Sequence, residues 1–246
     1  DRNFSVSLLL MFFTGAILFG TMSLLPPFLH NLLGFPLIDV GNLLVPRGLG
    51  TMAAMFVVGR LAGRLDMRWL ILLGLALTSL AMHEMTQFNT DINAWDIART
   101  GIVQGLGLGF VFVPLTTVAF STLAPRFRNE GTALFSLARN IGGSIGISAM
   151  ATLLARNAQV GHAALAENIN PFNLALRQAV ESGAHDLSTA PGLLALDAEV
   201  SRQASMLAYL QDFRLMMWVA LICIPLIALL RRPGWAAVPV ATPTAD

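Results

Sequence analysis

Long apolar stretches alternate with short polar connections along most of this chain. Each stretch approaches the roughly 20 residues that a helix needs to cross the hydrocarbon core of a bilayer. None shows the strict two-residue alternation of a membrane β-strand, and each is about twice too long for one. The pattern predicts an all-α integral membrane protein with six transmembrane helices, at about residues 4–28, 38–58, 69–87, 94–120, 131–154 and 210–230.

The one long connection in this scheme covers residues 155–209 and carries charges of both signs. Turn signals occur in it at Asn170-Pro171 and at Ala190-Pro191-Gly192, and the stretch near 193–207 is amphipathic. We expect a periplasmic loop with a short helix lying on the outer membrane surface. That helix is either a docking element for a partner or part of a solvated connector.

Composition supports the membrane assignment and excludes several kinds of chemistry. Apolar residues make up 55% of the chain and charged residues 12%, with a mean hydropathy of +0.68, so lipid must contact much of the surface. The cations form no dense patch, which excludes a nucleic-acid partner. Cys223 is predicted to be a small packing residue. No histidine or cysteine cluster has metal-ligand spacing, so we expect no metal and no cofactor.

The arginines predict how the chain is oriented in the membrane. They fall on alternate connections and before the first and after the last predicted helix, where Lys and Arg mark the cytoplasmic side: Arg2, Arg60, Arg64, Arg68, Arg126, Arg128, Arg231 and Arg232. Both ends of the chain are therefore expected in the cytoplasm. The opening Asp1-Arg2-Asn3-Phe4 enters an apolar segment without a signal-peptide cleavage pattern, so we expect the later part of a longer protein.

Polar residues inside the predicted helices are the candidate site. Arg47 lies near the middle of the second helix, where a charge is costly and persists mostly beside a cavity or a partner. It has two interpretations, a role in the transport pathway or its gating, and a structural role in an interhelical pair or helix end. Gln104 lies deep in the fourth helix. Arg139 and Asn140 lie about two turns into the fifth, shallow enough for Arg139 to reach water.

Carboxylates are predicted to lie only near the outer interface, where water can hydrate them. The residues concerned are Asp39, Glu84, Asp96 and Asp212. If the protein uses protons, this placement predicts that the main proton acceptor lies in the remainder of a longer protein.

Two glycine pairs have the four-residue spacing that lets helix backbones approach closely in lipid. They are Gly105 with Gly109 and Gly142 with Gly146. The spacing indicates close helix packing or, alternatively, a surface that slides during a conformational cycle. Residues 142–146 also match the Gly-x-Ser-x-Gly pattern of serine hydrolases, which needs a strand-to-helix turn and nearby acid and base groups. Here the pattern falls inside a predicted helix, so no catalytic residue is assigned.

The loop at residues 59–68 resembles the signature loop of the major facilitator superfamily as it occurs in the second half of its members. The resemblance implies that the loop is a cytoplasmic conformational latch, formed by Gly59, Arg60, Arg64, Asp66 and Arg68. Gly63 departs from the first-half version of the loop, which usually has an acidic residue there.

Two further segments resemble the C-terminal half of the 14-helix drug:proton antiporters, the EmrB/QacA group. They are Gln104-Gly105-Leu106-Gly107-Leu108-Gly109, followed by Val113-Pro114-Leu115-Thr116-Thr117, and Arg139-Asn140-Ile141-Gly142-Gly143-Ser144-Ile145-Gly146. The opening four residues and Asn170-Pro171-Phe172-Asn173 are similar to the EmrB branch in particular.

This resemblance implies a proton-driven exporter of drugs or other lipophilic compounds in a bacterial inner membrane. Two six-helix bundles would rock around a central site, and this chain would be the C-terminal bundle. The implied partners are protons, lipophilic substrates, the bilayer, the N-terminal half of the transporter and, by similarity, a periplasmic adaptor with an outer-membrane channel.

Other functions are open at this stage. The same scaffold serves dedicated exporters of one metabolite or signalling lipid. A non-transporting membrane scaffold or receptor subunit is a second alternative, which the costly midplane Arg47 argues against. An intramembrane enzyme would require Ser144 to react with an active-site probe, and we expect no enzyme.

Overall fold

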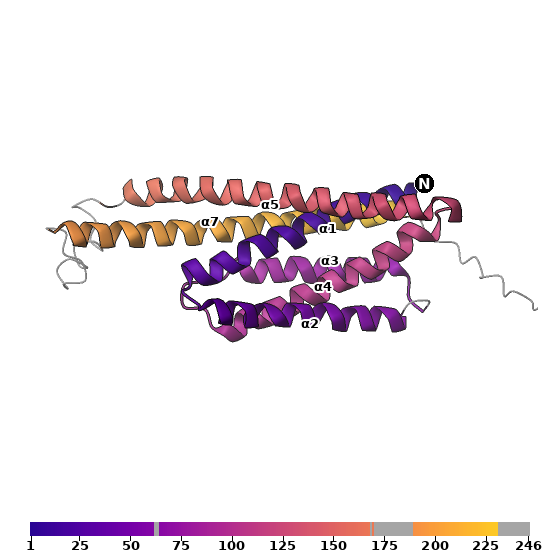
Figure 1. Ribbon diagram of the computed structural model, residues 1–246, viewed down its shortest axis with the longest axis horizontal. Coiled ribbons are helices and arrows are strands. Elements are labelled where there is room, and N and C mark those ends of the chain that lie inside the picture. The colour runs from indigo at the N-terminus through magenta and orange to yellow at the C-terminus, as the bar shows by residue number, and fades with distance from the viewer. Residues whose placement is uncertain (62–63, 168, 170–188, 231–246) are drawn as a thin grey trace, which may run out of the picture.

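The computed structural model describes residues 1–61, 64–167, 169 and 189–230, and every regular element within them is a helix. Figure 1 shows the long helices lying roughly alongside one another. Their bounds are α1 Arg2–Pro27, α2 Leu37–Leu61, α3 Met67–Met85, α4 Ala94–Ser121, α5 Arg128–Glu167 and α7 Ala190–Leu226. Three short turns are η1 Phe28–Leu32, η2 Pro125–Phe127 and η3 Ile227–Leu229. The prediction of an all-α protein is confirmed.

Four stretches of the described chain are long and apolar enough to cross a membrane. They are Arg2–Leu32, Leu37–Leu61, Ala94–Ser121 and Ala190–Leu229. The helices α3 and α5 are not among them, and α5 carries Arg139 and Asn140 as well as several glycines and serines. The chain is therefore a multi-pass membrane protein, while a bundle of six spanning helices stays a prediction.

Local sequence explains where the first helices begin and end. The Asp1 carboxylate accepts hydrogen bonds from the backbone N–H groups of Asn3 (2.8 Å) and Phe4 (3.2 Å), which caps α1. After the Pro26-Pro27 pair the chain forms the single π-helical turn η1. It then reverses at Gly34, whose φ of +75° suits a residue without a side chain.

The helices pack as two groups joined by α1 and α3. Helix α4 packs against both α2 and α3, and α1 packs against α4, α5 and α7. The start of α1, the α2–α3 loop and the α4–α5 turn share one end of the bundle, on the right of Figure 1. We call it the arginine-rich end, because these connections carry Arg2, Arg60, Arg64, Arg68, Arg126 and Arg128.

The opposite end of the bundle contains a cluster of aromatic rings around Phe28, which is fully buried. Its ring centroid lies 5.2 Å from that of Tyr209, 5.9 Å from that of Phe213 and 6.0 Å from that of Phe88. These contacts join η1, α7 and the turn after α3. Because edge-to-face and stacked rings add to the stabilisation from burial, this cluster is expected to hold that end of the bundle together.

The connection predicted at residues 155–209 is largely helical where the structure describes it. Helix α5 continues to Glu167 and α7 begins at Ala190, so the amphipathic stretch 193–207 is part of α7 and not a separate surface helix. The Thr189 hydroxyl caps α7 by accepting from the Gly192 N–H at 3.3 Å. Residues 168 and 170–188, with the signals at 170–173, and Gly63, Arg231 and Arg232 lie outside the described residues.

We call residues 155–167 of α5 and 190–209 of α7 the paired arms. They begin at the level of the Phe28 cluster, which contains Tyr209, and their far ends extend past the α1–α2 turn on the left of Figure 1. Helix α5 has 40 residues and α7 has 37, or about 60 and 55 Å at 1.5 Å per residue. A Cβ at Gly161 would lie 3.5 Å from the Ala204 Cβ. His162 Nε2 and Asp197 Oδ1 are 3.1 Å apart. The two arms thus pair through small residues and a polar contact, a pattern that a search for long apolar runs does not detect.

Candidate functional site

Arg47 is buried in α2, with 8% of its surface exposed. Its Nη2 donates to the backbone carbonyl of Leu18 in the middle of α1 at 3.4 Å. Its own carbonyl accepts a hydrogen bond from the Thr51 hydroxyl at 3.0 Å. The guanidinium therefore connects α2 to α1 through one long hydrogen bond, and among the described residues its other N–H groups have no hydrogen-bond acceptor.

Gln104 lies on α4 beside this arginine and is completely buried. Neither its amide nitrogen nor its amide oxygen has a hydrogen-bond partner among the described residues. The neighbouring Gly101 faces Arg47, because a Cβ built there would lie 3.7 Å from the Arg47 backbone nitrogen. Leaving a buried amide unpaired costs about 1–3 kcal/mol, so this position favours a function that supplies the missing partners at another stage.

Glycines bring α4 into backbone contact with α2 around Arg47. A Cβ at Gly105 would overlap the Arg47 carbonyl oxygen, and one at Gly109 would lie 2.8 Å from the Thr51 carbonyl oxygen. On the other side of the bundle, Gly142 and Gly146 of α5 lie against the backbone of α1 at Phe12 and Ala16. Both predicted glycine pairs thus lie at close helix crossings, and whether these crossings slide stays a prediction.

Arg139 and Asn140 lie on α5 and are divided between its two faces. The backbone carbonyl of Arg139 lies directly over Gly15 of α1, one helical turn before Leu18. Its Nε is buried without a partner among the described residues. Asn140 is exposed. Arg47 and the Arg139 backbone therefore both reach the middle of α1, and Gln104 lies on the turn of α4 that contacts Arg47, whereas Asn140 faces away from this group.

The predicted latch loop lies at the arginine-rich end, between α2 and α3. The Arg60 guanidinium carbon lies 3.8 Å from the centroid of the Phe56 ring. The Asp66 carboxylate accepts from the Arg68 backbone N–H at 3.1 Å and so caps α3. Two guanidinium nitrogens of Arg68 are buried without a partner among the described residues. Gly59 and Arg64 are exposed.

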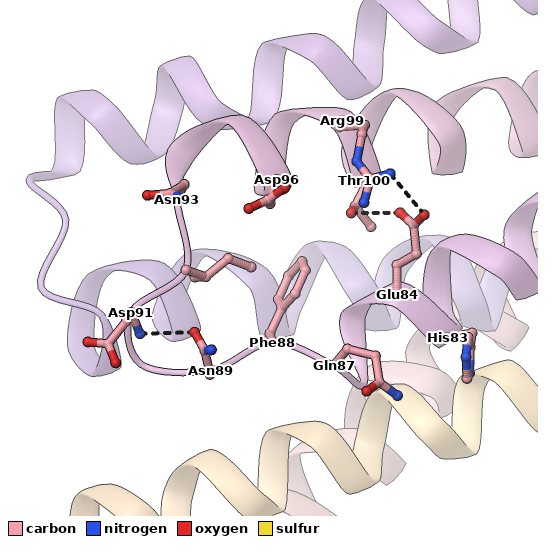
Figure 2. A pocket seen from close by; sticks show the side chains of 11 residues that line it. His83, Glu84, Gln87, Phe88, Asn89, Asp91, Asn93, Asp96, Arg99 and Thr100 are labelled. Atoms are coloured by element: carbon pink, nitrogen blue, oxygen red, sulfur yellow. Dashed lines mark hydrogen bonds and ion pairs between the residues drawn. The ribbon is translucent and has the colours of Figure 1, made fainter.

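A polar cavity of about 380 Å³ lies at the opposite end, in the turn between α3 and α4 (Figure 2). Glu84 is its central group: Oε2 accepts from the Thr100 hydroxyl at 3.0 Å, and Oε1 lies 3.5 Å from Arg99 Nη1. Asp91 and Asp96 also line it. Since Glu84 is already paired with both residues, this cavity is consistent with a structured entrance or a helix clamp.

Asp212 is the polar residue whose environment the sequence reasoning misjudged. We predicted hydration near the outer interface, but its side chain is 1% exposed and neither carboxylate oxygen has a hydrogen-bond partner among the described residues. It lies on α7 between Tyr209 and Met216, and both of these are buried. The signal was its angular position, because residues three and four apart share a helix face.

Comparison with known proteins assigns this fold to a family. Residues 1–147 match the family model of the Major Facilitator Superfamily. The chain belongs to the major facilitator superfamily. The matched segment includes α1 to α4 and the first half of α5, and it therefore contains Arg47, Gln104 and Arg139. These matches are to membrane transporters, so the chain falls among transporters and not among enzymes.

Three curated relatives illustrate the branch of the superfamily. The multidrug export protein EmrB of Escherichia coli (strain K12) is 29% identical over 174 residues, covering 70% of this chain and 34% of the relative. The fatty acid resistance protein FarB of Neisseria gonorrhoeae is 28% identical over 185 residues, 75% of this chain and 36% of FarB. The probable multidrug resistance protein EmrY of Escherichia coli (strain K12) is 24% identical over 241 residues, 96% of this chain and 46% of EmrY.

This chain thus spans about a third to a half of the length of these relatives. Among members of the superfamily, it is similar to drug exporters of the EmrB type. A solved structure supports the fold alone. It is a bacterial homologue of the human lysosomal transporter Spinster in an inward-facing, unoccupied conformation. The TM-score is 0.60 at 19% identity, over 94% of this chain and 49% of the other.

Proposed function

We propose that the complete protein exports drugs or other lipophilic compounds across a bacterial inner membrane, driven by a proton gradient, by alternating access. In this proposal the present chain is the C-terminal six-helix bundle, and it works with an N-terminal half. The observation that carries the proposal is the buried Arg47, whose guanidinium reaches from α2 to the Leu18 carbonyl of α1 beside an unpaired Gln104.

Burying Arg47 and Gln104 costs free energy, because both groups lose hydration. A charge inside a membrane protein is retained mostly where it faces a pathway or a partner. A single hydrogen bond of 3.4 Å satisfies little of a guanidinium, which has five N–H donors. Arg47 and Gln104 together would offer donors and an acceptor to a polar group of a passing substrate, and Arg139 of α5 would approach the same pathway from its own side of α1. Asn140, which is exposed on α5, would contribute only where the pathway continues over that outer face.

Orientation in this proposal follows from the arginine-rich end. Six arginines on the connections there suit the cytoplasmic side, which would place both ends of the chain in the cytoplasm. Gly59, Arg60, Arg64, Asp66 and Arg68 would then form the cytoplasmic latch. The paired arms would project into the periplasm, where they offer a surface for an adaptor protein that leads to an outer-membrane channel.

A second candidate function is export of one dedicated lipid or metabolite. The observation that favours it is the 28% identity to FarB, a relative named for fatty acid resistance, which is almost equal to the 29% identity to EmrB. A substrate panel of unrelated lipophilic drugs together with long-chain fatty acids separates the two functions. Transport of several drugs supports multidrug export, whereas transport of fatty acids alone supports a dedicated exporter.

The test is substrate transport in inverted membrane vesicles that contain the complete protein, with and without an imposed pH gradient. Arg47→Ala should reduce gradient-driven transport at least tenfold at normal expression, because it removes the guanidinium from the pathway. Arg214→Ala is the matched control, since Arg214 is exposed on α7 and should be replaceable. Wild-type transport by the Arg47 variant would remove Arg47 from the site.

A further inference from the structure

Asp212 lies in the part of α7 that crosses the bundle, not in the paired arms. Its neighbours along the buried face of α7 place it near α1: the Met216 sulfur accepts a hydrogen bond from the Thr21 hydroxyl of α1 at 3.4 Å. A Cβ on Gly20 would also overlap the Met216 methyl carbon, at 2.6 Å. Asp212 is one turn of α7 nearer the paired arms than Met216.

Aromatic rings cover α7 on the other side of Asp212. Phe28 contacts both Tyr209 and Phe213 edge-on, so it lies across the stretch of α7 that contains the carboxylate. The result is a carboxyl group with 1% exposure in surroundings built from rings and thioethers. An ionised carboxylate without a partner is very costly in such a place.

Charged groups on the elements packed against α7 do not pair with Asp212 in the described chain. Helix α1 has no ionisable residue after Arg2. On α3, His83 is exposed, and Glu84 is held by Arg99 and Thr100. His30 of η1 bonds to the Phe35 carbonyl and His162 of α5 to Asp197, while Arg156 of α5 and Arg214 of α7 are exposed. Two partly buried arginines lie at other levels: Arg68 of α3 is beside Ile224 and Ile227, about three turns along α7 from Asp212, and Arg139 of α5 is at the level of Gly15.

We propose that the Asp212 carboxyl group is a proton-binding site of this transporter, closed off in the conformation described here. Its use in coupling rests on the proposed function. The step is a simple binding equilibrium, in which the carboxylate gains one proton to become a neutral acid and later releases it. The neutral acid is the form that fits the closed, apolar site, and opening of the ring cluster around Phe28 would expose it to water at the end that carries the arms.

The sequence alone placed the proton acceptor outside this chain, whereas Asp212 lies within it. Arg47 and Asp212 also reach α1 at different levels, since Arg47 bonds to Leu18 and the Met216 contact is at Thr21, with Asp212 a further turn toward the arms. A substrate group near Arg47 and a proton near Asp212 would thus bind at different levels along α1.

The first experiment replaces the acid by its neutral isostere in the complete protein. Asp212→Asn should abolish substrate accumulation driven by a pH gradient, to less than a tenth of wild type, while transport down a substrate gradient continues. Asp39→Asn is the control, because Asp39 is exposed in the first turn of α2. Gradient-driven accumulation at the wild-type level in Asp212→Asn would overturn the proposal.

A second experiment does not depend on transport or on a variant that folds. A lipid-soluble carbodiimide reacts with protonated carboxyl groups, and mass spectrometry of the wild-type protein locates the modified residue. We expect labelling of Asp212 that declines as the pH rises, with little labelling of the exposed Asp39. Absence of label at Asp212 across an acid-to-alkaline series overturns the proposal. If wild-type protein shows no gradient-driven transport, the proposed function fails, and the labelling still decides whether Asp212 binds a proton.

Discussion

Replacing Gly105 by alanine tests whether the α2–α4 crossing depends on backbone contact. A Cβ at this position would lie 2.9 Å from the Arg47 carbonyl carbon and 3.0 Å from the Thr51 nitrogen, whereas ordinary contact begins near 3.4 Å. The atoms that the new methyl group would meet belong to the α2 backbone, so the clash cannot be relieved by rotating a side chain. The helices must separate by at least about 0.5 Å, at a cost of about 1–3 kcal/mol for overpacking.

Gly48→Ala is the matched control because it makes the same chemical change on α2 with no atom within 4 Å of the new methyl group. Both substitutions gain about 1 kcal/mol in helix propensity. Gly48→Ala should therefore stabilise the protein slightly, and Gly105→Ala should be about 1–3 kcal/mol less stable than the control.

The assay is the thermal midpoint of the detergent-solubilised complete protein, measured by the loss of monodisperse material on heating. A difference of 1 kcal/mol corresponds to roughly 2–4 °C when a unit of about 150–250 residues, such as this bundle, unfolds. We expect the Gly105 variant to melt at least about 2 °C below the Gly48 variant. Equal midpoints, or a higher midpoint for the Gly105 variant, would show that the crossing tolerates a methyl group and would refute the packing argument.

Two further substitutions address the end of the bundle that carries Phe28. Phe28→Ala should lower the free energy of unfolding by about 3–5 kcal/mol, because it leaves a cavity against Phe88, Tyr209 and Phe213; a midpoint within 2 °C of wild type would contradict this. Arg99→Ala should cost less than about 1 kcal/mol, since its contact with Glu84 is 3.5 Å long and half exposed; a midpoint loss of more than about 4 °C would show that the polar cavity is a clamp.

Much of the fold could be predicted because lipid exposure leaves a strong pattern in sequence. The predominantly apolar runs of α1, α2 and α4 locate those helices to within a few residues. The arms could not be found in this way, because residues 155–167 and 190–209 pack largely on each other and contain no long apolar run. Small residues such as Gly161 and Ala204 at their contact were the remaining signal.

The sequence predicted how far along each helix the site residues lie, but not which neighbouring helix each residue faces. Arg47 and Gln104 were chosen for their depth, and both are buried. Arg139 and Asn140 have nearly the same depth, yet adjacent helix positions differ by about 100°, so one faces α1 and the other is exposed. Asp212 was misjudged because its distance from the helix centre was considered without its place on the face shared with Tyr209 and Met216.

The paired arms are continuous with helices that pass through the bundle, and this continuity has a mechanical consequence. Residues 190–209 extend α7 by about 30 Å at 1.5 Å per residue. A stiff rod of that length acts as a lever, so a tilt of about 10° at its base displaces its tip by roughly 5 Å. A protein bound to the ends of the arms would thus be displaced by several ångströms during each rocking motion, without contacting the transported molecule.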